Sequence, residues 1–247
     1  MRTELFETLR DYLAEERLVA LATVIAGTHV GHQLLLTADG ESHGSLGTAA
    51  LDERVTARTR EIFHSFASQR HVVELEGQSH DVFIEILPPR PRLMIVGAVH
   101  VAVPLVHFAK ALGFQTIVID PRTAFLTPER FAHADTLITE WPDKALAELK
   151  LNENSYVALL SHDLKLDLPA LEIALRRPVR YVGALGSKKT HAKRVAAMRE
   201  AGFSDDEMAQ IYNPIGLPLG GRRAEEMAVS ILAEIVAVRH DRRKALA

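Results

Sequence analysis

Residues 93–102 read LMIVGAVHVA and residues 116–122 read TIVIDPR, and these two stretches decide the fold. Each is a run of β-favouring residues that ends in a loop carrying glycine or charged side chains, as a strand buried in a parallel sheet does. Later runs of the same character are 136–138, 157–160 and 179–182. Helical patterns lie between the runs, and strands that alternate with helices predict a parallel sheet covered on both faces. We therefore expect residues 92–247 to form a Rossmann-type, doubly wound α/β domain.

The first 88 residues carry a different pattern, in which short β-favouring runs follow an amphipathic helix. Apolar residues recur at helical spacing from Leu5 to Leu13. Two hairpin signals follow, at Ala38-Asp39-Gly40 and at Glu76-Gly77-Gln78-Ser79. The segment Pro88-Pro89-Arg90-Pro91 lacks three amide donors and continues neither a strand nor a helix. Residues 1–88 are accordingly expected to form a smaller α+β domain.

Composition excludes several classes of function. The 247 residues include 29 basic and 32 acidic side chains, a net charge of −3, so no overall positive field attracts nucleic acid or anionic lipid. The chain contains no cysteine, which excludes disulfides, thiolate zinc sites and iron–sulfur clusters. The acidic segment Met1 to Arg17 is unlike a signal peptide, and the apolar run from Leu93 to Val106 is shorter than a membrane span. We expect a cytoplasmic protein that binds neither nucleic acid nor membrane.

The loop after the first strand of the Rossmann-type domain is the first candidate site, because ligands of such sheets bind outside the carboxyl ends of the strands. The residues of interest here and at the end of the next strand are Gly97, Ala98, His100, Asp120 and Arg122. The spacing from Gly97 to Asp120 matches a dinucleotide-binding pattern, in which the acid accepts hydrogen bonds from ribose hydroxyls. Val99, however, replaces a second glycine, and its branched side chain would keep a pyrophosphate away from the backbone. NAD(P) binding, a structural turn and a different pose of the ligand all stay open.

The loop after the fourth strand carries an imidazole and carboxylates, on His162, Asp163 and Asp167. These groups are able to hydrogen-bond a polar ring. Either aspartate is equally suited to cap the helix that follows, because a carboxylate accepts hydrogen bonds from the free amides of a first turn. The sequence leaves both roles open for the aspartates and favours a ligand contact for His162.

The loop after the fifth strand gathers donors for an anion. Gly183, Gly186, Ser187 and Lys188 precede or begin a helix, so backbone amides, a hydroxyl and a cation converge at a helix N-terminus. The glycine spacing and the ending of the loop differ from those of a Walker loop. An anion site and a solvated basic face both fit this pattern.

The last loop is rich in glycine and apolar residues. It runs from Asn213 to Arg223 and includes Gly216, Gly220 and Arg222. We expect it to lie against the cleft, with a tight turn into the last helix as the alternative. The twelve histidines of the chain are scattered without the paired spacing of a zinc site, so no metal site is expected.

Together these motifs resemble those of the XdhC/CoxI family. The matching stretches are Gly-Ala-x-His-Val-Ala at 97–102, Ile-Asp-Pro-Arg at 119–122, Ser-His-Asp at 161–163, Tyr-Val-Gly-Ala-Leu-Gly-Ser at 181–187 and Pro-Ile-Gly-Leu at 214–217. Members of this family are accessory proteins that bind molybdenum cofactor and help to insert it into xanthine dehydrogenase, aldehyde oxidoreductase or carbon monoxide dehydrogenase apoenzymes. The resemblance covers residues 92–240 and, more weakly, the N-terminal part.

The resemblance implies a non-enzymatic chaperone whose ligand is molybdenum cofactor, as molybdopterin or its dinucleotide form. The phosphate or nucleotide part would lie on residues 183–188 and 216–222, while His162, Asp120 and Arg122 contact the polar ring or the sugar. The implied partner is a molybdoenzyme apoprotein of the xanthine dehydrogenase type. A cysteine desulfurase is a further candidate partner, and a homodimer is the implied assembly.

Two departures from the family pattern keep other functions open. The N-terminal part lacks the cysteine that the family carries after a run of glycines, and the corresponding stretch here is Gly47-Thr48-Ala49-Ala50. Val99 is the second departure. An NAD(P)- or flavin-dependent oxidoreductase with the same fold is one alternative. A degenerate paralogue that docks to a molybdoenzyme without binding cofactor is another.

Overall fold

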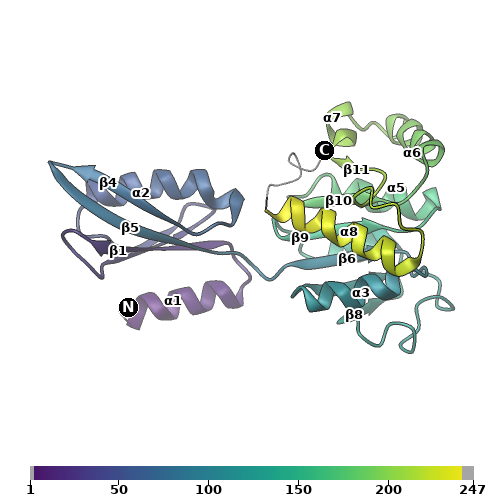
Figure 1. The fold of residues 1–247 in the computed structure, drawn as a ribbon, viewed down its shortest axis with the longest axis horizontal. Helices are drawn as coiled ribbons and strands as arrows, with labels where there is room; N and C mark the ends of the chain where they lie inside the picture. The colour runs from purple at the N-terminus through teal and green to yellow at the C-terminus, as the bar shows by residue number, and fades with distance from the viewer. Residues whose placement is uncertain (1–2, 241–247) are drawn as a thin grey trace. The chain divides into compact units, whose positions relative to one another are not determined.

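The computed structural model of the protein describes residues 3–240, apart from the side chain of Lys188. The chain divides between Pro89 and Arg90 into two compact units (Figure 1). Each unit contains one sheet and its own hydrophobic core. Residues 1–2 and 241–247, which the sequence assigns to the ends of the two expected domains, lie outside the described residues.

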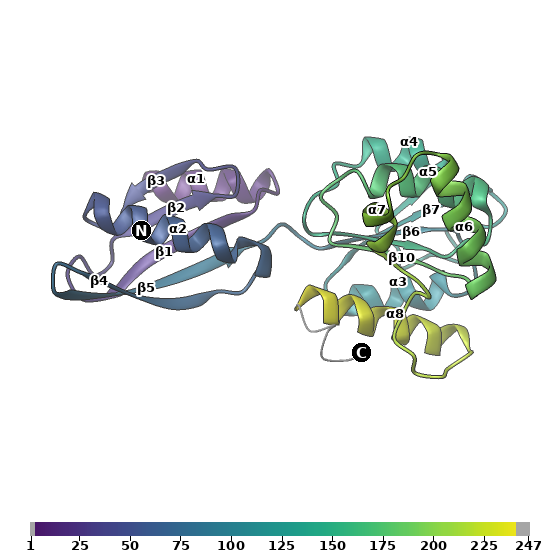
Figure 2. The same cartoon turned by 90° about the horizontal axis from the view of Figure 1, so that it is seen from above.

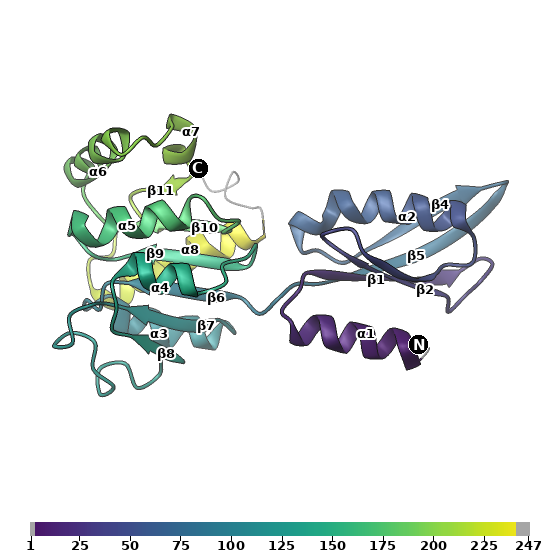
Figure 3. The same ribbon diagram turned by 180° about the vertical axis from the view of Figure 1, so that it is seen from behind.

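The N-terminal unit is a five-stranded antiparallel sheet with a helix on each face (Figure 3). Its elements are α1 (Thr3–Ala14), β1 (Val19–Ala26), β2 (Gln33–Thr37), β3 (Ser42–Ser45), α2 (Ala49–Ile62), a short 3-10 helix (Phe63–Ser65), β4 (Gln69–Leu75) and β5 (Gln78–Leu87). The strand order is β3-β2-β1-β5-β4. This arrangement confirms the smaller α+β domain and both hairpins that the sequence predicts.

Side chains along the strands of this sheet point alternately to its two faces, so each helix packs against its own row of apolar residues. Ala20, Ala22 and Val24 of β1 belong to the core under α2, whereas Val19 and Leu21 pack with Leu5 and Leu9 of α1. Thr48 is the N-cap of helix α2, and its side chain accepts a hydrogen bond from the amide of Leu51. The hydrophobic core of the unit therefore lies mainly between the sheet and α2.

The C-terminal unit is a six-stranded sheet in which every neighbouring pair of strands is parallel (Figure 2). Its elements are β6 (Arg92–Val96), α3 (Ala102–Ala111), β7 (Gln115–Ile119), β8 (Thr136–Ile138), α4 (Pro142–Glu148), β9 (Ser155–Leu159), α5 (Leu164–Ala174), β10 (Tyr181–Ala184), α6 (Lys188–Glu200), α7 (Asp205–Ala209), β11 (Ile211–Tyr212) and α8 (Ala224–Arg239). The strand order is β11-β10-β9-β6-β7-β8. The chain starts at β6, runs outward to β8 and returns to β9, so the direction of winding reverses between β6 and β9.

Helices cover both faces of this sheet and divide its core in two. One core joins the sheet to α3 and α8 through residues such as Leu105 and Ile235. The other joins it to α4, α5, α6 and α7 through residues such as Leu146 and Leu171. The doubly wound Rossmann-type architecture expected from residues 93–102 and 116–122 is confirmed. No helix within residues 3–240 is both long and apolar enough to span a membrane.

The sequence expectations missed two short elements, α7 and β11. The helix α7 has only five residues and depends on a capping box between Ser204 and Glu207. The strand β11 has two residues, and Ile211 pairs with Val182 of β10. Elements of this length contain too few residues for a periodic pattern of apolar side chains to show.

Candidate functional site

The candidate site lies where the strand order reverses, at the carboxyl ends of β6 and β9. The loops that leave these two strands touch at Gly97 and Ser161. Gly97 has a φ of +104°, and a Cβ atom placed on it would lie 2.9 Å from the backbone nitrogen of Ser161. Glycine is therefore required at this position both for its conformation and for the close approach of the two loops.

The carboxylate of Asp120, at the end of β7, holds the first loop in place. Its side chain is completely buried, and its oxygens accept hydrogen bonds from the amides of Ala98 at 2.8 Å and Arg122 at 3.0 Å. The Arg122 guanidinium donates two more, at 2.9 and 2.8 Å. Burial would raise the pKa of Asp120, but these hydrogen bonds and the charge of Arg122 outweigh it and hold the pKa below its ordinary value. Both carboxylate oxygens are thus engaged within the protein.

A cavity of about 390 Å³ opens above this loop. It is lined by Ala98, Val99, His100, Arg122, Phe125 and Arg130. The guanidinium of Arg122 stacks 4.5 Å from the centre of the Phe125 ring, and His100 is exposed. Val99 lines the cavity at the position where a dinucleotide pattern calls for glycine. His100 and Arg122 therefore line the same cavity, whereas the buried Asp120 does not line it.

In the loop after β9, the structure gives different roles to the two aspartates that the sequence could not distinguish. Asp163 is the N-cap of α5, where its carboxylate accepts a hydrogen bond from the amide of Lys165 at 3.0 Å. Asp167 does not cap the helix but is completely buried, and it accepts a hydrogen bond from the hydroxyl of Ser161 at 2.5 Å. His162 is exposed at the surface of the same loop. The capping role is confirmed for Asp163, and His162 faces solvent beside it.

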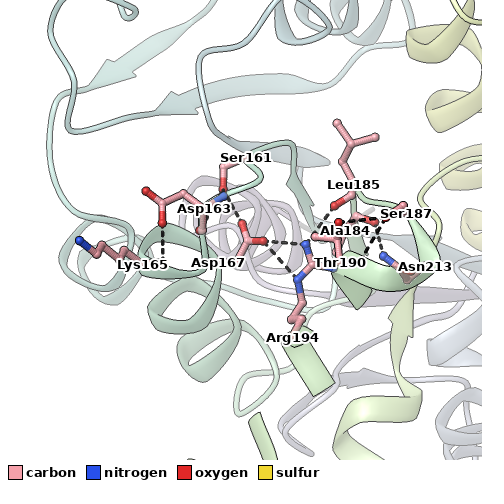
Figure 4. Close-up of polar contacts among 10 residues, drawn as sticks. All are labelled: Ser161, Asp163, Lys165, Asp167, Ala184, Leu185, Ser187, Thr190, Arg194 and Asn213. Carbon is pink, nitrogen blue, oxygen red and sulfur yellow. Dashed lines mark hydrogen bonds and ion pairs between the residues drawn. The ribbon is translucent and has the colours of Figure 1, made fainter. Parts of the chain in front are cut away.

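A buried arginine joins this loop to the next one (Figure 4). The Arg194 guanidinium in α6 donates hydrogen bonds to Asp167 at 2.6 and 3.2 Å and to the carbonyl oxygen of Leu185 at 2.9 Å. The side chains of Arg194 and Asp167 are both 0% exposed. The loops after β9 and β10 are therefore positioned by one network of hydrogen bonds beneath the protein surface.

The loop after β10 ends at the N-terminus of α6, where the sequence predicts an anion site. Ser187 is the N-cap and accepts a hydrogen bond from the amide of Thr190 at 3.2 Å. Gly186 precedes it with a φ of +150°, and α6 begins at Lys188, whose side chain lies outside the described residues. Gly183 lies in β10, where a Cβ atom would come within 2.3 Å of the Tyr181 hydroxyl.

The glycine-rich loop after β11 lies against the loop after β10. The side-chain amide of Asn213 donates to the carbonyl oxygen of Ala184 at 2.8 Å, and the amide of Ile215 donates to the same oxygen at 3.2 Å. The amide of Gly216 donates to the buried carboxylate of Glu234 at 2.9 Å. These contacts hold the loop at the carboxyl edge of the sheet. Sequence reasoning missed the roles of Asn213 and Glu234.

The same loop forms most of a cavity of about 550 Å³. Its walls include Leu185 from the preceding loop, residues 213–221 and the side chains of Met227 and Ile231 from α8. Gly220 lies in this wall, and Arg222 comes two residues later in the sequence. The side chain of Arg222 is exposed, and its backbone amide donates a hydrogen bond to the carboxylate of Glu226 at 2.9 Å. A largely apolar cavity of this size suits a flat organic ring.

The donor set of the carboxyl edge fits a phosphate-bearing ring. Backbone amides and the hydroxyl of Ser187 at the N-terminus of α6 are suited to an anion. Leu185, which is two residues before Ser187 in the sequence, lines the 550 Å³ cavity. In the described part of the chain, no group of three or more histidine or acidic side chains is placed to hold a metal ion.

Comparison with known proteins identifies the family. The model of the XdhC Rossmann domain matches residues 93–235, and that of the XdhC and CoxI family matches residues 12–75. A relative from Bacillus subtilis, named as a probable xanthine dehydrogenase subunit, is 29% identical over 95% of this chain. The molybdenum cofactor insertion chaperone PaoD of Escherichia coli is 34% identical over 61% of it. The matches span 64% and 41% of these two relatives.

A solved structure shares the fold. A crystal structure described as a xanthine dehydrogenase from Bacillus halodurans superposes with a TM-score of 0.55 at 21% identity, covering 99% of this chain and 97% of the other. This likeness supports the two-unit architecture. Because the matching family model of the Rossmann domain covers more than half of the sequence, the family assignment rests on the sequence itself. The chain belongs to the XdhC and CoxI family.

Proposed function

We propose that this protein binds molybdenum cofactor and assists its insertion into a molybdoenzyme of the xanthine dehydrogenase type. The observation that carries the proposal is the 550 Å³ apolar cavity beside the N-terminus of α6. A pterin with a phosphate-bearing side arm needs these two features next to each other. The PaoD relative, which is named as a molybdenum cofactor insertion chaperone, supports the same ligand.

Each loop has a part in holding the cofactor. The phosphate would take hydrogen bonds from the amides of the first turn of α6 and from Ser187, with Lys188 and Arg222 supplying positive charge. The pterin ring would lie between Gly216 and Gly220 on one side and α8 on the other. His162, His100 and Arg122 are the exposed polar groups that would contact the remaining polar edge. Binding and release are then the whole activity, and no residue is assigned a chemical step.

In this proposal Asp120 positions neighbouring groups of the protein, whereas the dinucleotide spacing suggests that it binds ribose hydroxyls. Its carboxylate accepts hydrogen bonds from Ala98 and Arg122, so it orients these groups and does not itself meet the ligand. The same observation weighs against the NAD(P)-dependent oxidoreductase, because a dinucleotide site needs this acid for the ribose hydroxyls. Val99 in the cavity wall weighs against it as well.

The partners are proposed on the same basis. One relative bears the name of xanthine dehydrogenase and another that of a cofactor insertion chaperone, and both names support a molybdoenzyme apoprotein as the recipient. A cysteine desulfurase and a second copy of the chain are further proposed partners. The degenerate paralogue, which would dock without binding cofactor, differs from the main proposal in a single measurable property.

That property is bound pterin. The protein is purified after co-expression with a cofactor biosynthesis pathway and assayed for pterin, molybdenum and pyridine nucleotide. Bound pterin supports the chaperone, and bound nucleotide with reduction of a dye would support the oxidoreductase instead. Protein that carries neither, but still binds the apoenzyme in a titration, would be the docking paralogue.

A further inference from the structure

A buried carboxylate lies in the wall of the largely apolar 550 Å³ cavity, and the cofactor-binding roles given above do not use it. It belongs to Glu234 of α8, which is 2% exposed and is the one charged side chain among the described residues that line this cavity. Moving a carboxylate from water into apolar surroundings is unfavourable unless hydrogen bonds compensate for the lost hydration. A charge at this place therefore needs donors, from the protein or from a ligand.

The helix α8 carries this carboxylate on the face that lines the cavity. On this side the cavity is lined by Met227, Ser230, Ile231 and Glu234. Their spacing of three and four residues places them on one side of the helix. Glu234 is about two turns from Met227, so it lies at one end of this row. A flat ring that packs on the apolar side chains of the row would have Glu234 at its edge.

Two protein donors reach one oxygen of this carboxylate. The Tyr181 hydroxyl donates to Oε2 of Glu234 at 2.7 Å, and the backbone amide of Gly216 donates to the same oxygen at 2.9 Å. A carboxylate offers about four acceptor positions on its two oxygens. Glu234 is therefore able to accept hydrogen bonds from a ligand while these two protein contacts stay in place.

A carboxylate in this position distinguishes heterocycles by their edges, because an ionised carboxyl group accepts hydrogen bonds and donates none. The 2-amino-4-oxopyrimidine part of a pterin carries an amino group beside a ring N–H, so this edge presents two adjacent donors. Adenine carries an accepting ring nitrogen beside its amino group, and its edge would turn a lone pair toward the carboxylate. Glu234 therefore suits a pterin and weighs against the adenine of a pyridine dinucleotide.

We propose that Glu234 selects the 2-amino-4-oxopyrimidine edge of the ring that the cavity holds. This inference rests on the proposed cofactor function and adds to it a residue that determines specificity and the orientation of the ring. The donor edge faces Glu234 of α8, and the phosphate-bearing arm leaves toward Ser187 at the first turn of α6.

Two ligands that differ only at this edge test the selection. They are 6-hydroxymethylpterin phosphate and the corresponding lumazine phosphate, in which an oxygen atom replaces the 2-amino group. Each is titrated into the full-length protein by equilibrium dialysis. We expect wild type to bind the pterin at least about tenfold more tightly, because the lumazine loses a hydrogen bond to a charged acceptor.

E234Q separates this selection from support of the loop. Glutamine keeps one oxygen, which is able to accept from Tyr181 and Gly216, and replaces the other with an amino group that donates. We expect E234Q to bind the pterin at least about tenfold more weakly and the lumazine as well as or better than the pterin. E225Q makes the same change on α8 outside the residues that line the cavity, and it should keep the preference of wild type.

Guanosine monophosphate carries the same edge on a purine and distinguishes the source of the ring. Pterin bound more tightly than this nucleotide supports the cofactor as the source. Tighter binding of the nucleotide, weakened in E234Q, would support the role of Glu234 and overturn the pterin as its ligand.

The remaining outcomes separate this inference from the proposed function. A wild type that binds none of the three ligands would overturn both. Pterin bound without preference over lumazine, or a preference that E234Q retains, would overturn the role of Glu234 alone. The comparison of ligands in wild type needs no substitution, so it tests the inference even if thermal unfolding shows E234Q to be unstable.

Discussion

Arg194 of α6 and Asp167 of α5 form a completely buried ion pair, with Nη2 of the arginine 2.6 Å from a carboxylate oxygen. The same carboxylate accepts the hydroxyl of Ser161, and the same guanidinium donates to the carbonyl oxygen of Leu185. The pair therefore links the loop that follows β9 to the loop that follows β10. Two of the loops that form the candidate site share this single support (Figure 4).

Removing one member of the pair should destabilise the C-terminal unit severely. D167L leaves the Arg194 charge buried without its partner, and we expect a loss of about 3–5 kcal/mol in the free energy of unfolding. The measurement is urea denaturation followed by circular dichroism. The double variant D167L/R194M removes both charges and should recover most of the loss. A double variant as unstable as D167L would show that the pair is not the source of the effect.

Asp120 should make stability depend on pH on the acid side. The pKa of its carboxyl group is below the ordinary value in the folded protein, so the ionised form stabilises the fold above about pH 4 and this contribution is lost as the pH falls further. D120N should therefore be less stable than wild type at pH 7 by about 1–2 kcal/mol. The difference should shrink as the pH is lowered below about 4. A difference that is constant from pH 7 to pH 3 would contradict this assignment.

Gly97 should tolerate alanine less well than another glycine with similar backbone geometry. G97A brings a Cβ atom to 2.9 Å from the backbone of Ser161, whereas at Gly113, with a φ of +83°, nothing lies within 4 Å. We expect G113A to cost about 1–2 kcal/mol for its left-handed conformation and G97A about 1–3 kcal/mol more for the clash. Thermal unfolding of the two variants compares them, and equal losses would show that the two loops do not meet as described.

Removing a cation from the proposed phosphate position should weaken cofactor retention, whereas removing a cation from the last turn of α6 should not. K188A and R222A remove the two cations that the proposal assigns to the phosphate, and each should weaken retention roughly tenfold, as expected for a charge-assisted hydrogen bond. R199A removes charge from the last turn of α6, where Arg199 pairs with Asp205 at 2.9 Å, and should leave retention unchanged. Retention is measured as pterin remaining after gel filtration. Equal retention in K188A, R222A and R199A would remove the anion-site assignment.

The sequence predicts which loops lie at the carboxyl edge of the sheet, because their place follows from the alternation of strands and helices. Runs such as 93–96 and 157–160 mark buried strands, and their ends must meet at one edge of a parallel sheet. The glycine-rich loop that starts at Asn213 was expected at the cleft, and it lies beside Leu185 in the wall of the larger cavity.

The direction in which each side chain points is harder to predict. The spacing from Gly97 to Asp120 fits a ribose-binding acid, yet the carboxylate is turned toward Ala98 and Arg122. Asp167 and Arg194 are 27 residues apart, and only the packing of α5 against α6 brings them together. Sequence spacing fixes the strand end on which a residue lies, whereas the rotation of a helix and the rotamer of a side chain decide which neighbour it meets.

The central claim is that the carboxyl edge of the Rossmann unit holds a phosphate-bearing pterin. The measurement that tests it most directly is the pterin content of wild type, R222A and R199A, purified side by side after co-expression with cofactor biosynthesis. Bound pterin in wild type and R199A, with a clear loss in R222A, is the predicted result. Pyridine nucleotide in place of pterin, or the same pterin content in all three proteins, would contradict the claim.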